Sequence, residues 1–174
     1  MLLSREELLA TLFRETDRAQ RMRSPLGLIY FGIEGAADCR LQVGQPTFDE
    51  AVHQGLRRVL KLLRCYDSLG QIAEGEFVLV LPGCSGRNAA AMAGRLNKEV
   101  FASLVTVDAE QIALSGCYGV AAGRGRSPFV VLREAEVAFR RARAQGLGTV
   151  EICDTDSDSL VPLIPVIEHE GLHW

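Results

Sequence analysis

The sequence LGQIAEGEFVLVLP, residues Leu69–Pro82, predicts two β-strands joined by a tight turn. We expect the arms of this hairpin at Ser68–Ile72 and Phe77–Leu81. Glu74-Gly75 between them supplies the small, conformationally permissive residue that a tight turn requires. This stretch raises the question whether the turn holds a metal ion, or has lost the carboxylate that a metal would need and kept only the shape.

Patterns for helices and strands alternate on the N-terminal side of the hairpin. The capping box Ser4–Glu7 precedes an apolar helical face and predicts a helix from Ser4 to about Arg23. The almost continuous apolar run Leu26–Ile33 predicts a strand that is covered on both faces. A second capping box, Thr47–Glu50, predicts a helix that ends near Arg64.

The same alternation continues on the C-terminal side. We expect helices at Asn88–Phe101 and Pro128–Gln145, and strands at Ile112–Ala121 and Thr149–Cys153. The sequence therefore predicts one α/β (α+β) domain over residues 1–153, with helices packed on a central five-stranded sheet. Residues 154–174 form an acidic linker, DTDSDS, and a tail, LVPLIPVI and beyond, which either packs on the domain or begins another.

Composition limits the classes of function. The chain has 174 residues, 48% of them hydrophobic and 24% charged, which fits one globular domain. Its net charge of -3 argues against bulk attraction to nucleic acid or to an anionic membrane. The five cysteines form no CxxC pair and predict reduced thiols in a cytoplasmic protein. No apolar run suggests membrane insertion, and MLLSREELLA is charged too early for a signal peptide.

Four blocks in this order resemble the GGDEF domain of diguanylate cyclases, from about Arg5 to Glu151. These blocks are SPLGLIYFGIE, LLRCYDSLGQIAEGEFVLVLP, SGCYGVA and REAEVAFRRARAQGLGTVEI. The resemblance implies a nucleotidyl-cyclase-like fold with a mainly antiparallel sheet. It also implies the family's chemistry, in which two domains of a dimer join two GTP molecules into cyclic di-GMP with the help of divalent metal.

The resemblance places glycines where the family has its two metal-binding carboxylates. The matching positions are Gly32, at the end of the first strand, and Gly75, in a signature that here is Ala73-Glu74-Gly75-Glu76-Phe77. Magnesium prefers carboxylate oxygens, so we expect no metal, no other cofactor and no catalytic residue in this signature. The alternative is a weakly active cyclase that binds Mg²⁺ through Glu34 together with Glu74 or Glu76.

The residues of the implied substrate pocket also differ from those of the family, and these differences also argue against catalysis. The guanine-binding Asn is matched by Arg40 and the phosphate-binding Lys by Arg143, while the Arg after that helix is matched by Leu147. The Asp that partners the Asn is kept as Asp49, although a carboxylate in a first helical turn also has a structural reason. A Glu at position 74 would repel a triphosphate. We therefore expect a catalytically inactive domain with, at most, a residual nucleotide pocket at Asp49 and Arg143.

The residues of the family's inhibitory site have counterparts in this sequence. Its R-x-x-D motif, five residues before the signature, corresponds to Arg64 and Asp67, and its second arginine corresponds to Arg95. A forked guanidinium stacks on a guanine or binds its Hoogsteen edge, and a carboxylate accepts from guanine N–H groups. The alternative is that Arg64 ends a helix and pairs with Asp67 on the surface.

These observations predict a receptor that binds cyclic di-GMP at Arg64, Asp67 and Arg95 and passes the signal to an unknown protein. The alternatives are the weakly active cyclase, a GTP-binding regulatory module and a protein-interaction scaffold that needs no nucleotide. Because cyclic di-GMP cross-links two domains in this family, a ligand-dependent homodimer is also expected. We expect no nucleic acid partner and no membrane insertion.

Overall fold

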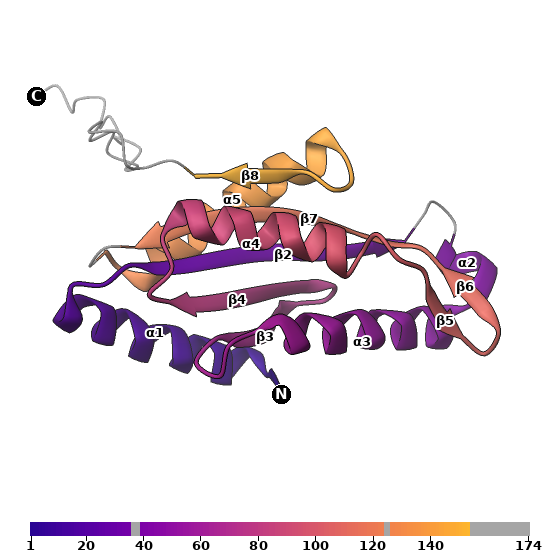
Figure 1. The fold of residues 1–174 in the computed structure, drawn as a ribbon, viewed down its shortest axis with the longest axis horizontal. Helices are drawn as coiled ribbons and strands as arrows, with labels where there is room; N and C mark the ends of the chain where they lie inside the picture. Colours follow the sequence, from indigo (N-terminus) through magenta and orange to yellow (C-terminus); the bar gives the residue numbers. More distant parts are fainter. Residues whose placement is uncertain (36–38, 124–125, 154–174) are drawn as a thin grey trace, which may run out of the picture.

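The computed structural model describes residues 1–35, 39–123 and 126–153. Strand β2 (Leu26–Gly35) lies inside the sheet, antiparallel to β4 (Glu76–Pro82) on one side and to β7 (Leu114–Gly123) on the other (Figure 1). Strand β3 (Ser68–Ala73) pairs with β4 and forms the predicted hairpin. These antiparallel pairings confirm the predicted fold class and the mainly antiparallel sheet.

The sheet has six strands rather than the five that we expected, in the order β1-β3-β4-β2-β7-β8. The additional strand, β1 (Leu2–Leu3), pairs in parallel with β3, and β8 (Val150–Ile152) pairs in parallel with β7. A strand of two residues is too short to produce a periodic pattern, which is why the sequence did not indicate β1.

A second, two-stranded sheet also escaped the sequence prediction. It consists of β5 (Val105–Val107) and β6 (Glu110–Ile112), joined by Asp108 and Ala109, which both have positive φ angles. The predicted strand from Ile112 to Ala121 was therefore wrong at its start. Ile112 ends β6, and β7 begins at Leu114.

The helices confirm the predicted elements but shift some boundaries. Helix α1 (Arg5–Met22) has the Ser4–Glu7 capping box, and α5 (Pro128–Gln145) ends before Gly146 as expected. The second capping box is wrong: α3 (Gln45–Leu62) begins before Thr47, with Gly44 as its N-cap and Pro46 in its first turn. Proline favours the start of a helix and here outweighs the Thr47 signal. The remaining helices are α2 (Cys39–Val43) and α4 (Gly86–Glu99), which Ser85 caps before the predicted start at Asn88.

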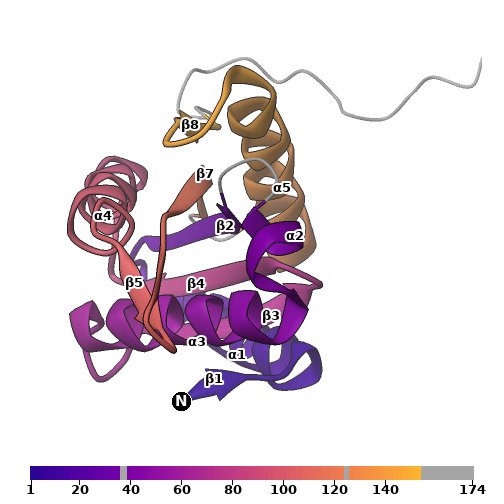
Figure 2. The ribbon, with the colours of Figure 1, turned by 90° about the vertical axis from the view of Figure 1, so that its right-hand side faces the viewer.

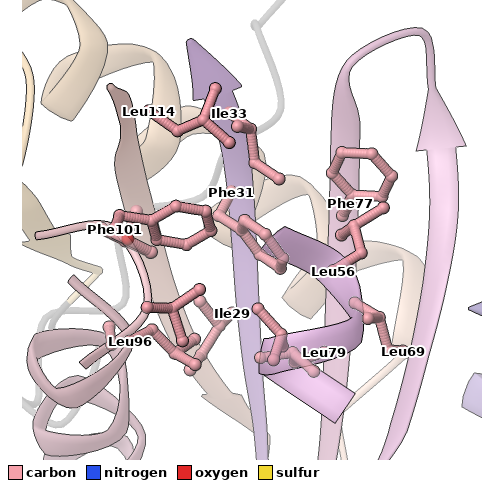
Figure 3. Packing of buried hydrophobic residues seen from close by; sticks show 14 of the residues in the cluster. Ile29, Phe31, Ile33, Leu56, Leu69, Phe77, Leu79, Leu96, Phe101 and Leu114 are labelled. Carbon is pink, nitrogen blue, oxygen red and sulfur yellow. The ribbon is translucent and has the colours of Figure 1, made fainter. Parts of the chain in front are cut away.

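The helices form a layer on each face of the sheet (Figure 2). Helices α3 and α4 cover one face and α1 and α5 cover the other, and each face has its own apolar cluster. Alternate residues of β2 point to opposite faces, so Ile29 and Phe31 belong to the first cluster, drawn in Figure 3, and Leu28 and Tyr30 to the second. Strand β2 is thus covered on both faces, as the apolar run predicted.

Helix α5 approaches β7 very closely at Gly119. A Cβ atom at this position would lie 2.1 Å from the backbone nitrogen of Phe139 and 2.2 Å from the carbonyl oxygen of Ala135. This contact fixes the height of α5 above the sheet. It places the ring of Phe139 next to Gly32 of β2, where a Cβ atom would lie 3.0 Å from the ring.

Some expectations fall outside the described residues. These are the expectations for the linker and tail at residues 154–174. Within the described ranges, no helix is both long enough and apolar enough to cross a lipid bilayer.

Candidate functional sites

The turn of the β3–β4 hairpin lies against the end of β2. Gly75 has a φ angle of 69°, which the tight turn requires, and its carbonyl oxygen accepts a hydrogen bond from the Ile33 backbone N–H at 3.4 Å. The register shifts between Gln71 and Ala73, just before the turn. The signature is therefore held beside the position at which β2 presents Gly32 and Glu34.

Two carboxylates near this turn are bound to arginines of α5. Glu76 accepts from the Arg140 guanidinium at 2.6 and 3.2 Å, and the Tyr30 hydroxyl also donates to it. Burial and this hydrogen bond raise the pKa of Tyr30 above its usual value. Glu34 pairs with Nε of Arg143 at 2.8 Å. Both carboxylate charges are thus balanced by guanidinium groups.

The residues present do not fit the magnesium site that the sequence resemblance implies. Neither Gly32 nor Gly75 offers a side-chain carboxylate, and the Phe139 ring occupies the space that a side chain at Gly32 would enter. Over residues 1–35, 39–123 and 126–153, no group of three or more His, Cys, Asp or Glu side chains is placed to hold a metal ion. Glu34 and Glu76 would first have to leave their arginines.

A cavity of about 540 Å³ lies beside this turn, and we call it the signature cavity. Its lining includes Glu34, Arg40, Phe48, Glu74 and Arg143. The guanidinium of Arg40 stacks over the Phe48 ring at 4.7 Å.

The two residues of the predicted residual nucleotide pocket are not together in the signature cavity. Arg143 lines it, whereas Asp49 is not among the described lining residues and instead accepts a hydrogen bond from the Gln45 amide at 2.7 Å. Phe48 is part of the lining but was not singled out from the sequence, because a lone aromatic residue on a helix gives no functional signal.

A second cavity, of about 350 Å³, brings together Arg64, Asp67 and Arg95. We call it the Arg64 cavity. Leu81 and Pro82 at the end of β4 and Met92 of α4 supply apolar walls. Residues 64–67 and 95 become neighbours because the hairpin returns the chain to the end of α3 before α4 begins.

The polar groups of the Arg64 cavity have local partners. The Asp67 carboxylate accepts from the Arg64 backbone N–H at 2.9 Å, and partial burial raises the pKa of Asp67. The Arg64 guanidinium donates to the Tyr66 hydroxyl at 2.9 Å, and Arg95 pairs with Glu99 at 3.3 Å.

The charges of Arg64 and Asp67 attract each other, but the Asp67 carboxylate is hydrogen-bonded to the Arg64 backbone N–H and not to the guanidinium. Helix α3 ends at Leu62, so Arg64 follows the helix instead of ending it. Within the part of the chain that the structure describes, no carboxylate forms an ion pair with the Arg64 guanidinium. Tyr66 lies inside the R-x-x-D motif, but its role as a hydrogen-bond partner could not be inferred from spacing.

A family model described as "Diguanylate cyclase, GGDEF domain" matches residues 1–149. The chain belongs to the GGDEF domain family. No curated protein matches it significantly.

Solved GGDEF domains share the fold at low sequence identity. The GGDEF domain of YfiN (TpbB) from Pseudomonas aeruginosa has a TM-score of 0.81 and 20% identity, over 87% of this chain and 96% of that one. DgcB from Caulobacter crescentus, solved with cyclic di-GMP, has a TM-score of 0.81 and 17% identity, over 88% and 90%. SiaD from P. aeruginosa, solved with its activator SiaC, has a TM-score of 0.80 and 24% identity, over 87% and 58%.

Replacement of Glu76 by alanine is expected to lower the free energy of unfolding by about 1–3 kcal/mol. The substitution leaves the partly buried Tyr30 hydroxyl without its acceptor and removes a partner of Arg140. Glu74→Ala, in the same exposed turn, is the matched control and should change stability by less than about 0.5 kcal/mol. Urea unfolding of both variants measures the difference, and equal effects would show that the Glu76 contacts do not stabilise the domain.

Proposed function

We propose that this chain is a catalytically inactive GGDEF domain that binds cyclic di-GMP in the Arg64 cavity and acts as a receptor or regulatory module. The observation that carries the proposal is that Arg64, Asp67 and Arg95 line one cavity although they are up to 31 positions apart in sequence. The signature here is degenerate, with glycine at both positions where the family has metal-binding carboxylates.

The Arg64 cavity has the chemistry that a cyclic dinucleotide requires. Its two arginines supply planar, permanently charged groups for phosphates and guanine edges, and Asp67 supplies an acceptor for guanine N–H groups. Tyr66 and Glu99, which hold the arginines now, lie in exposed positions, so exchange of these contacts for ligand contacts costs little. The apolar walls formed by Met92 and Leu81 suit the faces of the bases.

The charges around the signature turn support the proposed absence of cyclase activity. Phosphoryl transfer from GTP needs metal ions that neutralise developing negative charge. Here Glu34 and Glu76 are bound by Arg143 and Arg140. A weakly active cyclase that uses Glu34 with Glu76 would have to break both pairs to assemble a metal site, and one that uses Glu34 with Glu74 would have to break the Glu34–Arg143 pair. This makes the cyclase the less favoured alternative.

A second candidate is a module that holds a nucleotide in the signature cavity without metal. The observation in its favour is the volume of about 540 Å³ with two arginines, Arg40 and Arg143, in its lining. Glu74 in the same lining disfavours a triphosphate. This candidate predicts binding of GTP with chelator present, and no cyclic di-GMP formed.

A receptor needs a partner that reads its state. SiaD, a diguanylate cyclase of the same fold, was solved in complex with a protein activator. We infer a signalling protein as the partner here, and a homodimer that forms when cyclic di-GMP bridges two copies. If no nucleotide binds, a scaffold that contacts proteins alone is the remaining alternative.

A thermal-shift experiment tests the proposal with the chain as it is. A ligand that binds only the folded state stabilises it by mass action, so cyclic di-GMP in large excess should raise Tm by several degrees. Cyclic di-AMP, which lacks the guanine edges, is the matched control and should raise Tm much less. No shift with cyclic di-GMP, or equal shifts with both, would contradict guanine recognition in the Arg64 cavity.

Binding of cyclic di-GMP is expected to weaken as the pH falls. The loss of affinity should begin at a higher pH than it would with an aspartate of ordinary pKa. Partial burial raises the pKa of Asp67. Only the ionised carboxylate is a full acceptor for guanine N–H groups, so affinity is retained above this raised pKa and is lost as the pH falls through it.

The measurement is a series of titrations from neutral to acidic pH on the wild type and on Asp67→Asn. The amide does not titrate, so the variant should bind more weakly and with a flat pH profile. If the affinity of the wild type depended on pH as little as that of Asp67→Asn, Asp67 would not be part of the binding site.

A further inference from the structure

Exposed apolar side chains lie together where α1 meets the start of α5. Phe13 is 44% exposed and Phe129 is 61% exposed, and their rings meet edge to face with centroids 5.0 Å apart. Val130, which is 43% exposed, follows Phe129 on α5. We call these three residues the α1–α5 patch. Two exposed aromatic rings that contact each other are more typical of a surface that another segment covers than of open surface.

The last described residues lie at the same end of the sheet as this patch. Strand β8 runs parallel to β7 and so points toward the end of the sheet where β7 finishes, just before α5 begins (Figure 1). The Cys153 backbone N–H donates to the Val120 carbonyl at 2.8 Å, and Cys153 packs against the apolar cluster that contains Val131 of α5. The chain that follows Cys153 therefore starts close to the first turns of α5.

The sequence after Cys153 has the length to reach the patch. The polar spacer DTDSDS spans up to roughly 20 Å when extended, which exceeds the diameter of about 10–12 Å of a helix with its side chains. The apolar segment LVPLIPVI, Leu160–Ile167, follows at once. Its two prolines favour an extended, polyproline-type backbone, and such segments bind surfaces lined by aromatic rings at a low cost in entropy.

Net charge favours contact between the tail and the rest of the chain. Residues 154–174 carry five carboxylates and no Lys or Arg, so with a net charge of -3 for the whole chain, residues 1–153 carry +2. Arg14 and Arg18 of α1 and Arg133 of α5 are near the patch in sequence, and each pairs with a carboxylate of its own helix, Glu15 for the first two and Glu136 for the third. The acidic residues on either side of the apolar segment are thus attracted to the net positive charge of residues 1–153 as a whole.

We propose that Leu160–Ile167 docks on the α1–α5 patch of its own chain. The apolar side chains cover Phe13, Phe129 and Val130. The tail then belongs to the GGDEF domain instead of beginning another unit. This docking does not involve the Arg64 cavity, so it does not depend on the proposed function.

Hydroxyl-radical footprinting of the full chain, read by mass spectrometry, tests the docking at the patch itself. Phe13 and Phe129 should be oxidised severalfold more slowly in the wild type than in the variant Leu163→Asp/Ile164→Asp, which makes the apolar segment polar. Thr155→Asp/Ser159→Asp is the matched control, because it adds the same charge in the spacer and leaves the apolar segment intact. Leu104, which is 50% exposed, serves as the internal reference and should not change.

Three results would overturn the proposal. Equal oxidation of Phe13 and Phe129 in the wild type and in Leu163→Asp/Ile164→Asp would mean that the segment does not cover the patch. If Phe13 and Phe129 also lost protection in Thr155→Asp/Ser159→Asp, the added charge alone would explain the change in oxidation. Protection that appears only at high protein concentration would assign the patch to the tail of a second copy.

Discussion

Replacement of Gly119 by alanine is expected to destabilise the domain by more than about 4 kcal/mol, a large part of the stability of an ordinary domain. The added Cβ atom would lie 2.1 Å from the Phe139 backbone nitrogen and 2.2 Å from the Ala135 carbonyl oxygen. Both neighbours are backbone atoms inside α5, so no rotation of a side chain relieves the overlap. Helix α5 must move off the sheet, taking Arg140 and Arg143 away from Glu76 and Glu34.

The matched control is Gly94→Ala on α4. A Cβ atom there meets nothing within 4 Å, and alanine in a helix interior is favoured over glycine by roughly 0.5–1 kcal/mol. Chemical denaturation of both variants should therefore give shifts of opposite sign. A Gly119→Ala variant as stable as the wild type would mean that α5 does not lie against β7 as described.

Arg64→Ala is expected to weaken the binding of cyclic di-GMP by about 1.5–3 kcal/mol, which corresponds to a factor of roughly ten to more than a hundred in Kd. The guanidinium is the cation of the Arg64 cavity that pairs with no carboxylate among the described residues, and its present partner is the Tyr66 hydroxyl. Because Arg64 is exposed, the free energy of unfolding should stay within about 0.5 kcal/mol of the wild type.

Arg21→Ala controls for the loss of one positive charge. Arg21 lies on α1, on the opposite face of the sheet from the Arg64 cavity, and its side chain is 73% exposed. Its removal should leave Kd unchanged. Equal losses in Arg21→Ala and Arg64→Ala would show that general electrostatic attraction, and not the cavity, determines affinity.

The sequence predicted the fold well where long patterns determine it. The apolar run of β2, the β3–β4 hairpin and the capped helix α1 are each specified by several consecutive residues. The prediction from sequence failed where strand pairing or a single residue determines the structure. Strand β1 exists only through its contact with Leu69 and Gly70 of β3, and α3 begins at Gln45 because Pro46 suits a first helical turn.

The residues of the Arg64 cavity were predictable from the sequence as positions, but their contacts were not. The spacing of Arg64, Asp67 and Arg95 came from the family resemblance, and the structure places them in one cavity. The pairs Arg140–Glu76 and Arg143–Glu34 could not be anticipated, because each joins residues more than 60 positions apart. They depend on the close approach of α5 to β7, which one glycine permits without any periodic pattern.

Calorimetric titration of the full chain with cyclic di-GMP, with GTP and Mg²⁺ in a parallel run, tests most directly whether the chain is a receptor. We expect a dissociation constant for cyclic di-GMP in the micromolar range or below, and no cyclic di-GMP formed from GTP. Absence of binding would mean that Arg64, Asp67 and Arg95 are ordinary surface charges, and product formed in the parallel run would identify an active cyclase.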